Sequence, residues 1–214
     1  MKNKKLLLFT VIVLAIGFIA GINFYQKSED NKNAQLTASG SVSFVRNHSP
    51  AFGNNKNNVT IVEFIDPECE ACAYFHPIVK KVFYEYKDEV KFVYRYLDNH
   101  KNSRYAIRVL EAARKQGKFK ETLDVMFKYQ PVWAAHNAPK PQLIWNYMGE
   151  AGLDVDKLRA DFDAMDVSDI TSTDRSDARS LGVRGTPTIF VNGKKLAKLD
   201  YKSFLDLVES EIYK

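Results

Sequence analysis

Cysteine is scarce in this chain, which has two in 214 residues, Cys69 and Cys72. A scaffold stapled by disulfides would carry more cysteines at wider spacings. A bridge between these two would close a very small loop, so it would restrict the unfolded chain little. The pair is therefore a poor structural staple, and its spacing indicates redox chemistry or metal binding.

Several motifs that define other functions are also missing. The sequence has no Gly-rich phosphate loop and no stretch of interleaved basic and aromatic residues of the kind that binds nucleic acid. The acidic segment 154–177 lacks the spacing of a calcium loop. Lysine and arginine alternate with acidic residues, so the net charge of +5 is typical of a solvated surface. We expect no nucleic-acid partner, no metal and no cofactor.

One long apolar run lies near the N-terminus. Three lysines within the first five residues precede a segment from Leu6 to Ile22 that is apolar apart from one threonine and small residues. A basic start followed by such a run directs export, with the lysines left in the cytoplasm. The run is short for a membrane span of about 20 residues and long for a signal-peptide core of roughly 7–15. Segment 1–22 is expected to be a signal anchor or a removed signal peptide, and the anchor is favoured.

The chain after this run begins with a polar segment. Residues 23–58 are rich in Asn, Ser, Lys and Gln, which predicts a linker, with a short edge strand at Val42–Val45. Residues 59–98 have the pattern of the first part of an α/β domain. Its expected elements are a buried strand at 59–65, a helix at 70–88 and a second strand at 91–97.

The second half of the chain is mainly helical in pattern. Glycines and prolines divide residues 99–181 into short amphipathic stretches, which predicts an all-helical insertion. Residues 182–214 complete the α/β domain with a strand, a hairpin turn at Asn192-Gly193 and a closing helix. The order predicts an α/β fold whose sheet is split by the inserted helices.

Cys69 falls where the first strand has ended and the next helix begins. The free N–H groups and the positive end of that helix stabilise an anion, and the thiolate is the nucleophile of disulfide exchange. Cys72 lies about one turn later and should be more shielded. Cys69 is thus expected to attack and Cys72 to resolve. A zinc site would recruit His76, but three ligands leave a structural site incomplete, so His76 is expected at the helix surface.

Glu63 lies on the strand that leads to Cys69. The strand period places it on the same face as Ile61 and Ile65, so a carboxyl group among apolar neighbours should have a raised pKa. One interpretation is a proton acceptor for Cys72, or a group that tunes the pair. The other is a structural carboxylate that is paired with Arg95 or a lysine.

The dipeptide Thr186-Pro187 stands at the start of the last major strand. Bonds before proline are the ones that adopt the cis form. A cis bond here would leave the backbone of Thr186 free to pair with a substrate strand near the thiols.

Together these features resemble the DsbA-like branch of the thioredoxin superfamily over about residues 42–213. The matching positions are Ser49-Pro50, Gly53, Val59–Phe64, Cys69-Glu70-Ala71-Cys72, Pro77, Leu181-Gly182-Val183, Gly185-Thr186-Pro187-Thr188 and Asn192-Gly193. The resemblance implies a thioredoxin fold with an inserted helical domain, a cis-Pro187 beside the thiols and Glu63 as the buried acid near them. It also implies disulfide exchange with exported proteins and recycling by a membrane redox partner.

The residues around the cysteines depart from the family pattern. Strongly oxidising members commonly carry Pro and an aromatic residue or His between the cysteines, whereas this chain has Glu70 and Ala71, with Glu68 just before Cys69. Two carboxylates beside Cys69 should disfavour its thiolate and make the disulfide less oxidising.

We therefore expect a dithiol oxidase in the cell envelope, on the periplasmic face of the inner membrane, weaker than the strongest members of the family. The alternatives are a disulfide reductase or isomerase, or a non-catalytic chaperone or metal-handling module with the same fold.

Overall fold

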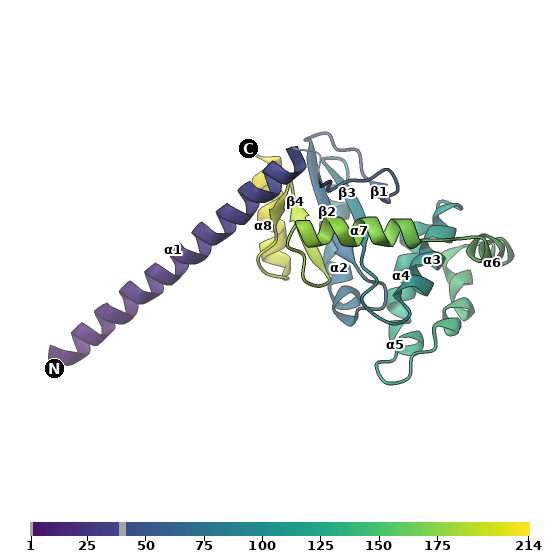
Figure 1. Cartoon of the computed structure of the whole chain (residues 1–214), viewed down its shortest axis with the longest axis horizontal. Helices are drawn as coiled ribbons and strands as arrows, with labels where there is room; N and C mark the ends of the chain where they lie inside the picture. The colour runs from purple at the N-terminus through teal and green to yellow at the C-terminus, as the bar shows by residue number, and fades with distance from the viewer. Residues whose placement is uncertain (1, 39–41) are drawn as a thin grey trace. The chain divides into compact units, whose positions relative to one another are not determined.

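A computed structural model describes residues 2–38 and 42–214, and the chain divides into two compact units, Met1–Val42 and Ser43–Lys214. The first unit contains one helix, α1 (Lys2–Ala38), drawn in purple in Figure 1. Its segment Leu6–Gln35 is long and apolar enough to cross a membrane, a property that a signal sequence near the N-terminus shares. Helix α1 continues to Ala38, so it includes the first part of segment 23–58, for which a linker was expected.

The second unit is built on a five-stranded mixed sheet in the order β1-β3-β2-β4-β5 (Figure 1). Its strands are β1 (Ala51–Phe52), β2 (Val59–Ile65), β3 (Val90–Tyr96), β4 (Thr188–Val191) and β5 (Lys194–Lys195). The central strands β2 and β3 are parallel, and the other neighbours are antiparallel. The expectation of an edge strand at Val42–Val45 is wrong. The edge strand is β1, where Ala51 pairs with Val93.

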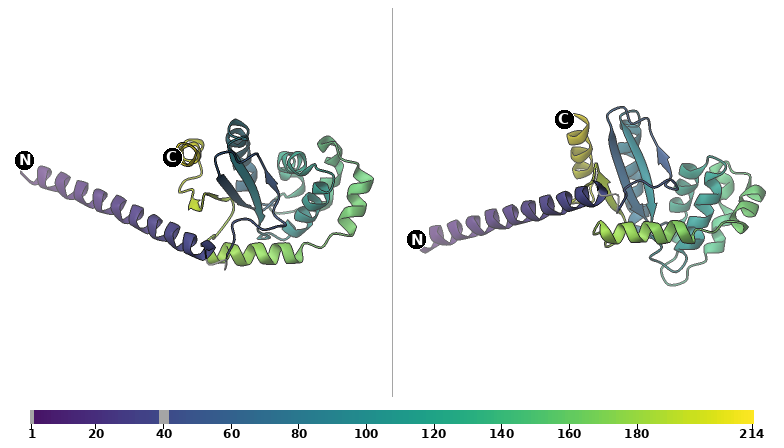
Figure 2. Two further views of the ribbon diagram at one scale, coloured as in Figure 1. Left: turned by 90° about the horizontal axis from the view of Figure 1, so that it is seen from above. Right: turned by 45° about the horizontal axis from the view of Figure 1, so that its top comes forward.

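Helices cover both faces of this sheet (Figure 2). On one face α2 (Glu70–Glu85) packs against α8 (Tyr201–Ile212), and on the other face α7 (Ser168–Ser180) packs against β3. Successive side chains of β2 point to opposite faces of the sheet. Every residue of the strand except Thr60 is buried, so the strand contributes side chains to the core on both faces. Residues that form the core of the α2 face include Ile61, Ile65, Phe75, Val79 and Phe204.

The predicted helical insertion lies between β3 and β4. It consists of α3 (Ser103–Arg114), α4 (Phe119–Lys128), α5 (Gln130–Trp133), η1 (Pro141–Asn146), η2 (Met148–Ala151) and α6 (Val155–Asp163), and α7 leads back to the sheet. Residues 141–151, one of the short stretches of the predicted insertion, form two 3₁₀ helices rather than one α-helix. Apolar periodicity over so short a stretch does not distinguish the two helix types.

A buried charge cluster joins α7 to the sheet. Arg95 of β3 is fully buried, and its guanidinium donates to Asp174 at 2.8 Å and to Asp177 at 2.6 Å. It also donates to the carbonyl oxygen of Ser43 at 2.6 Å, and Arg46 forms a second bond to Asp177 at 2.7 Å. The cluster therefore fixes the chain before β1 as well as α7, and loss of Arg95 would remove the fully buried cation that Asp174 and Asp177 share.

The substitution Arg95→Met tests this cluster. We expect the free energy of unfolding to fall by about 3–5 kcal/mol, because two buried carboxylates lose their cation. Urea unfolding followed by circular dichroism measures the change. The control Lys157→Met removes an exposed ion pair with Asp161, for which we expect a loss of at most about 0.5 kcal/mol. Equal losses for the two variants would contradict the stabilising role of Arg95.

Candidate active site

The two cysteines lie at the start of α2 with different exposure. Cys69 is the N-cap residue, in an extended conformation, and its carbonyl oxygen accepts hydrogen bonds from the amides of Cys72 at 3.1 Å and Ala73 at 3.2 Å. Both cysteines are free thiols; Cys69 is half-buried, whereas Cys72 is 1% exposed. The relative exposure is the one expected, so an incoming thiol can reach Cys69 but not Cys72.

The peptide bond between Thr186 and Pro187 is cis, as the resemblance implied. The chain at this point lies beside the thiols, because Sγ of Cys69 is 3.4 Å from the carbonyl oxygen of Thr186. Residues 117 positions apart in the sequence thus meet at one end of the sheet. The backbone that precedes β4 forms one wall of the site.

The surroundings of the two sulfur atoms shift the pKa values of the two thiols in opposite directions. The pKa of Cys69 is lowered to about 5, chiefly by a hydrogen bond from the Cys72 thiol. Burial opposes this shift, while the Thr186 side chain and the amides of Cys72 and Ala71 reinforce it. Burial raises the pKa of Cys72 well above its usual value, and the neighbouring Cys69 adds to that effect. At neutral pH the reduced pair therefore holds a thiolate on Cys69 and a thiol on Cys72.

The carboxylates of Glu68 and Glu70, the acidic neighbours of Cys69 in the sequence, contact residues other than Cys69. The buried carboxylate of Glu68 accepts hydrogen bonds from the backbone amide of Asn102 at 2.6 Å and from its side chain at 2.8 Å. Glu70 is exposed and lies 4.0 Å from the ring of His136. Hydrogen-bond donors around the sulfur lower the pKa of Cys69 to about 5, and the expected opposing effect of the two carboxylates stays a prediction.

Glu63 is buried at the centre of the sheet, with Tyr94 and Ile189 as its cross-strand neighbours. Its Oε2 has no hydrogen-bond partner among residues 2–38 and 42–214. Burial raises its pKa to about 8. Arg95 is engaged with carboxylates of α7, so it is not the partner of Glu63. The charge of Glu63 raises the pKa of Cys72, which places the two groups within electrostatic reach of each other.

Sequence reasoning missed Asp66, the residue directly after β2. Its side chain is fully buried and accepts hydrogen bonds from the backbone amides of Glu68, Asn99 and His100 at 2.9, 2.9 and 3.2 Å. It also bonds Nδ1 of His100 at 2.8 Å and Oγ of Ser103 at 2.9 Å. Asp66 thus joins the cysteine loop to the loop after β3. The only signal in the sequence was an aspartate after a strand, which is a common turn residue.

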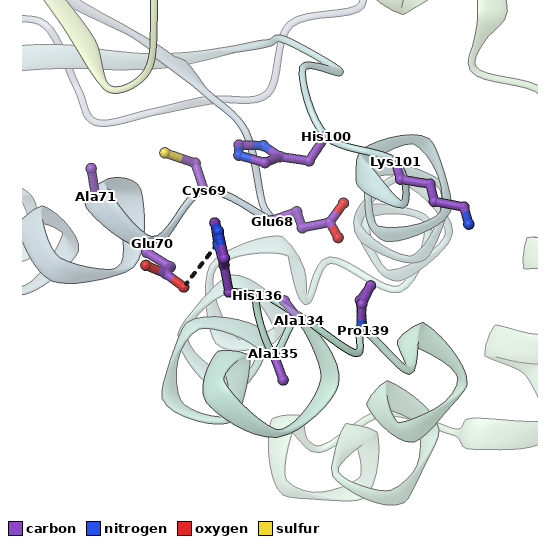
Figure 3. Close-up of a pocket in the computed structure, with 10 residues that line it drawn as sticks. All are labelled: Glu68, Cys69, Glu70, Ala71, His100, Lys101, Ala134, Ala135, His136 and Pro139. Atoms are coloured by element: carbon purple, nitrogen blue, oxygen red, sulfur yellow. Dashed lines mark ion pairs between the residues drawn. The ribbon is translucent and has the colours of Figure 1, made fainter.

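A cavity of about 520 Å³ opens beside Cys69 (Figure 3). One side is formed by the cysteine loop and by His100 and Lys101 of the loop after β3. The opposite side comes from the helical insertion and includes His136. Gln130 of α5 connects the insertion to the cysteine loop, since its amide donates to the carbonyl oxygens of Pro67 at 2.9 Å and of Cys69 at 3.0 Å.

His76 bonds a carboxylate of α4 rather than joining the two cysteines around a zinc site. It is buried rather than at the helix surface, and its Nε2 is 2.6 Å from Oδ1 of Asp124 on α4. Lys80 pairs with the same carboxylate. Within the part of the chain that the structure describes, no group of three or more His, Cys, Asp or Glu side chains is arranged to hold a metal ion.

A family model described as thioredoxin matches residues 46–210. This chain belongs to the thioredoxin family. The crystal structure of oxidised BdbD from Bacillus subtilis superposes on this thioredoxin-family chain with a TM-score of 0.68 at 24% identity, covering 78% of this chain and 94% of that one. The thioredoxin fold expected from the sequence is thereby confirmed.

Two relatives match this chain over very different shares of their own length. The probable disulfide bond formation protein D of Bacillus cereus is 26% identical over 100% of this chain and 99% of that protein. The Na(+)/H(+) antiporter NhaA of Herminiimonas arsenicoxydans is 34% identical over 144 residues, which are 67% of this chain and 22% of the antiporter. The thioredoxin-family chain therefore matches less than a quarter of that relative's length.

The variant Cys72→Ala tests the origin of the low Cys69 pKa. Because the Cys72 thiol is the strongest donor to the thiolate, we expect its removal to raise the Cys69 pKa by about one unit or more. The pH dependence of alkylation of the reduced protein measures this value. The control Tyr74→Phe changes an exposed side chain on the same helix and should leave the pKa near 5. A Cys72→Ala protein that still titrates near 5 would refute the assignment.

Glu63 should make stability depend on pH. Its folded pKa of about 8 exceeds the ordinary 4.5, so the unfolded chain ionises first and stability falls as pH rises between these values. The variant Glu63→Gln does not ionise there. We expect its stability relative to the parent protein to increase across that window by on the order of 4 kcal/mol.

Urea unfolding of both proteins in the reduced state, below pH 4.5 and near pH 8, measures the difference. The matched control is Glu85→Gln, at the exposed end of α2, for which we expect the same change from parent at both pH values. An equally flat result for Glu63→Gln would show that Glu63 ionises normally.

Proposed function

We propose that this chain is an extracytoplasmic thiol–disulfide oxidoreductase that acts as a net dithiol oxidase. The observation that carries the proposal is the Cys69 thiol, whose pKa is lowered to about 5 at the N-terminus of α2 while Cys72 is buried. A stabilised thiolate is a good leaving group, and a stabilised reduced form makes the disulfide more oxidising. The full-length similarity to a probable disulfide bond formation protein supports the same class.

The chemistry begins with the oxidised protein, in which Cys69 and Cys72 share a disulfide. A substrate thiolate attacks Sγ of Cys69, the S–S bond breaks, and Cys72 leaves with the electron pair. Burial raises the pKa of the Cys72 thiol and of Glu63, so a protonated Glu63 is suited to return a proton to Cys72. The product of this step is a mixed disulfide between the substrate and Cys69.

A second substrate thiolate then attacks the substrate sulfur of the mixed disulfide. Cys69 leaves as a thiolate, which its low pKa favours. The substrate has lost two electrons and gained a disulfide, and the protein holds the electrons as a dithiol. A membrane redox partner is proposed to remove them and restore the Cys69–Cys72 disulfide.

Substrate is proposed to bind along the backbone of Thr186, whose carbonyl oxygen lies 3.4 Å from the attacking sulfur. An extended substrate segment can pair with this backbone in the manner of an added strand, and Pro187 keeps the site open because it carries no N–H. Side chains next to the substrate cysteine would enter the cavity beside Cys69. The substrates proposed are exported proteins whose cysteines are unfolded and accessible.

The cell envelope is the proposed location. The apolar segment of α1 follows lysines at positions 2, 4 and 5, which favours a cytoplasmic N-terminus and an extracytoplasmic thioredoxin domain. Cysteine oxidation persists in that compartment. An inner-membrane anchor fits the length and composition of the helix.

Oxidation of reduced, unfolded ribonuclease A tests the proposal. We expect the oxidised protein to introduce disulfides into it, and Cys69→Ser and Cys72→Ala to be inactive because neither can form the Cys69–Cys72 disulfide. With scrambled ribonuclease A, whose cysteines are already in disulfides, the Cys69 thiolate of Cys72→Ala should displace one substrate thiolate and form a mixed disulfide that resolves slowly. Glu85→Gln serves as the surface control with unchanged activity. Equilibration with glutathione fixes the direction of the reaction. A disulfide as reducing as that of thioredoxin, at about −270 mV, would exclude a net oxidase and favour the reductase.

A further inference from the structure

His100 lies at the rim of the cavity beside the attacking sulfur. It belongs to the loop after β3, and Figure 3 shows its ring extending from that loop toward Cys69. Its side chain is 47% exposed, so the ring is accessible to solvent on one side. Neither Glu70 nor Ala71, the two residues between the cysteines, brings a positive charge to this sulfur.

Hydrogen bonds to Asp66 and Ser103 fix the position of His100. Nδ1 of His100 is 2.8 Å from Oδ2 of the fully buried Asp66, and its backbone amide bonds the same oxygen at 3.2 Å and Oγ of Ser103 at 3.0 Å. A ring whose Nδ1 donates to a carboxylate carries its second ionisable position at Nε2. The carboxylate therefore sets both the orientation of the ring and its preference for a proton.

We propose that His100, positioned by Asp66, is the cation of the redox centre and stabilises the Cys69 thiolate of the reduced protein. The inference rests on the proposed function, since it assigns a role within the same site. It names His100 as an electrostatic partner of the reacting sulfur and Asp66 as a positioning residue.

The charges around His100 agree with this role. Asp66 lies behind the ring, while Glu68 and Cys69 approach it from the cysteine loop. Lys101 follows it in its own loop, and the pair of Glu70 and His136 lines the same cavity.

Burial lowers the pKa of His100, but the hydrogen bond to Asp66 and the negative charges of Asp66, Cys69 and Glu68 raise it above its ordinary value. Coupling between two sites is reciprocal. The thiolate that favours protonation of the ring is stabilised by the protonated ring to the same extent. When Cys69 enters a disulfide its charge disappears, so the pKa of His100 should be lower in the oxidised protein.

An NMR titration of the histidine ring protons in both redox states tests this directly. The chain has four histidines, and the His100 signal is identified by its loss in His100→Gln. We expect the pKa of His100 to be higher in the reduced protein by on the order of half a unit or more, while the ring signals of His48, which bonds Asp174, should be the same in both redox states. Because the parent protein is compared with itself, the result does not depend on the folding of a variant. Equal values in both states would overturn the proposal.

Charge substitution gives a second, independent readout. In His100→Gln we expect the Cys69 pKa to rise and the equilibrium constant for oxidation of glutathione to fall on the order of threefold to tenfold. His100→Lys should recover part of both changes because it restores a cation. The control Lys157→Gln removes a cation from α6 and should alter neither.

The two proposals fail in different ways. If the parent protein does not oxidise ribonuclease A, the proposed function fails while the His100 titration still reports on the coupling. If the protein oxidises ribonuclease A normally and His100→Gln leaves the Cys69 pKa unchanged, only the role of His100 is refuted.

Discussion

The carboxylate of Asp66 is the contact on which the arrangement around Cys69 depends. It is fully buried at the end of β2 and accepts hydrogen bonds from the cysteine loop and from the loop after β3. Its backbone oxygen also accepts the amide of Cys69 at 3.0 Å. Satisfying so many donors with one residue leaves the chain little freedom where β2 passes into α2. The position of Cys69 as N-cap is therefore imposed by the sheet rather than by α2 alone.

A second constraint is the uneven burial of the ionisable groups on the α2 face. Cys72 and Glu63 are both deprived of water, and each is held in its neutral form by that environment. Cys69, three residues away, receives hydrogen bonds that favour its charge. The same short segment thus holds a charged and an uncharged sulfur. An uncharged carboxyl group is tolerated in the sheet although it lowers stability, which is typical of residues kept for function.

Much of the fold could be predicted because its signals are local. The β2 strand at 59–65, the start of α2 at Glu70 and the turn at Asn192-Gly193 are as expected. Each depends on strand alternation, on helix termini or on a residue that accepts positive φ. The two-residue strand β1 escaped prediction because only its pairing with β3 defines it.

The site, like the fold, was predictable only where local sequence signals identify a residue. The cysteine pair, Glu63 and the Thr186-Pro187 dipeptide were identified from position in the chain. The structure brings Thr186 to Cys69 at one end of the sheet and places Glu63 within β2, where its charge affects Cys72. The direction of the Glu68 side chain, which Asn102 determines, could not be predicted because proximity in sequence does not give it. His100 was missed for the same reason, since it becomes a neighbour of Cys69 only when β2 and β3 lie side by side. Asp66 is close to Cys69 in the chain, but its bonds to the loop after β3 form only in that arrangement.

Gln130 gives the inserted helices a mechanical connection to the nucleophile. Its amide donates to the carbonyl oxygens of Pro67 and Cys69. If the insertion swung away from the sheet, as hinged domains do, two backbone acceptors would lose their partner at the residue that reacts. A bulky segment that forces the cavity wider would therefore loosen the backbone that positions the Cys69 sulfur. The two bonds of Gln130 would in this way limit the size of the segment that fits beside Cys69.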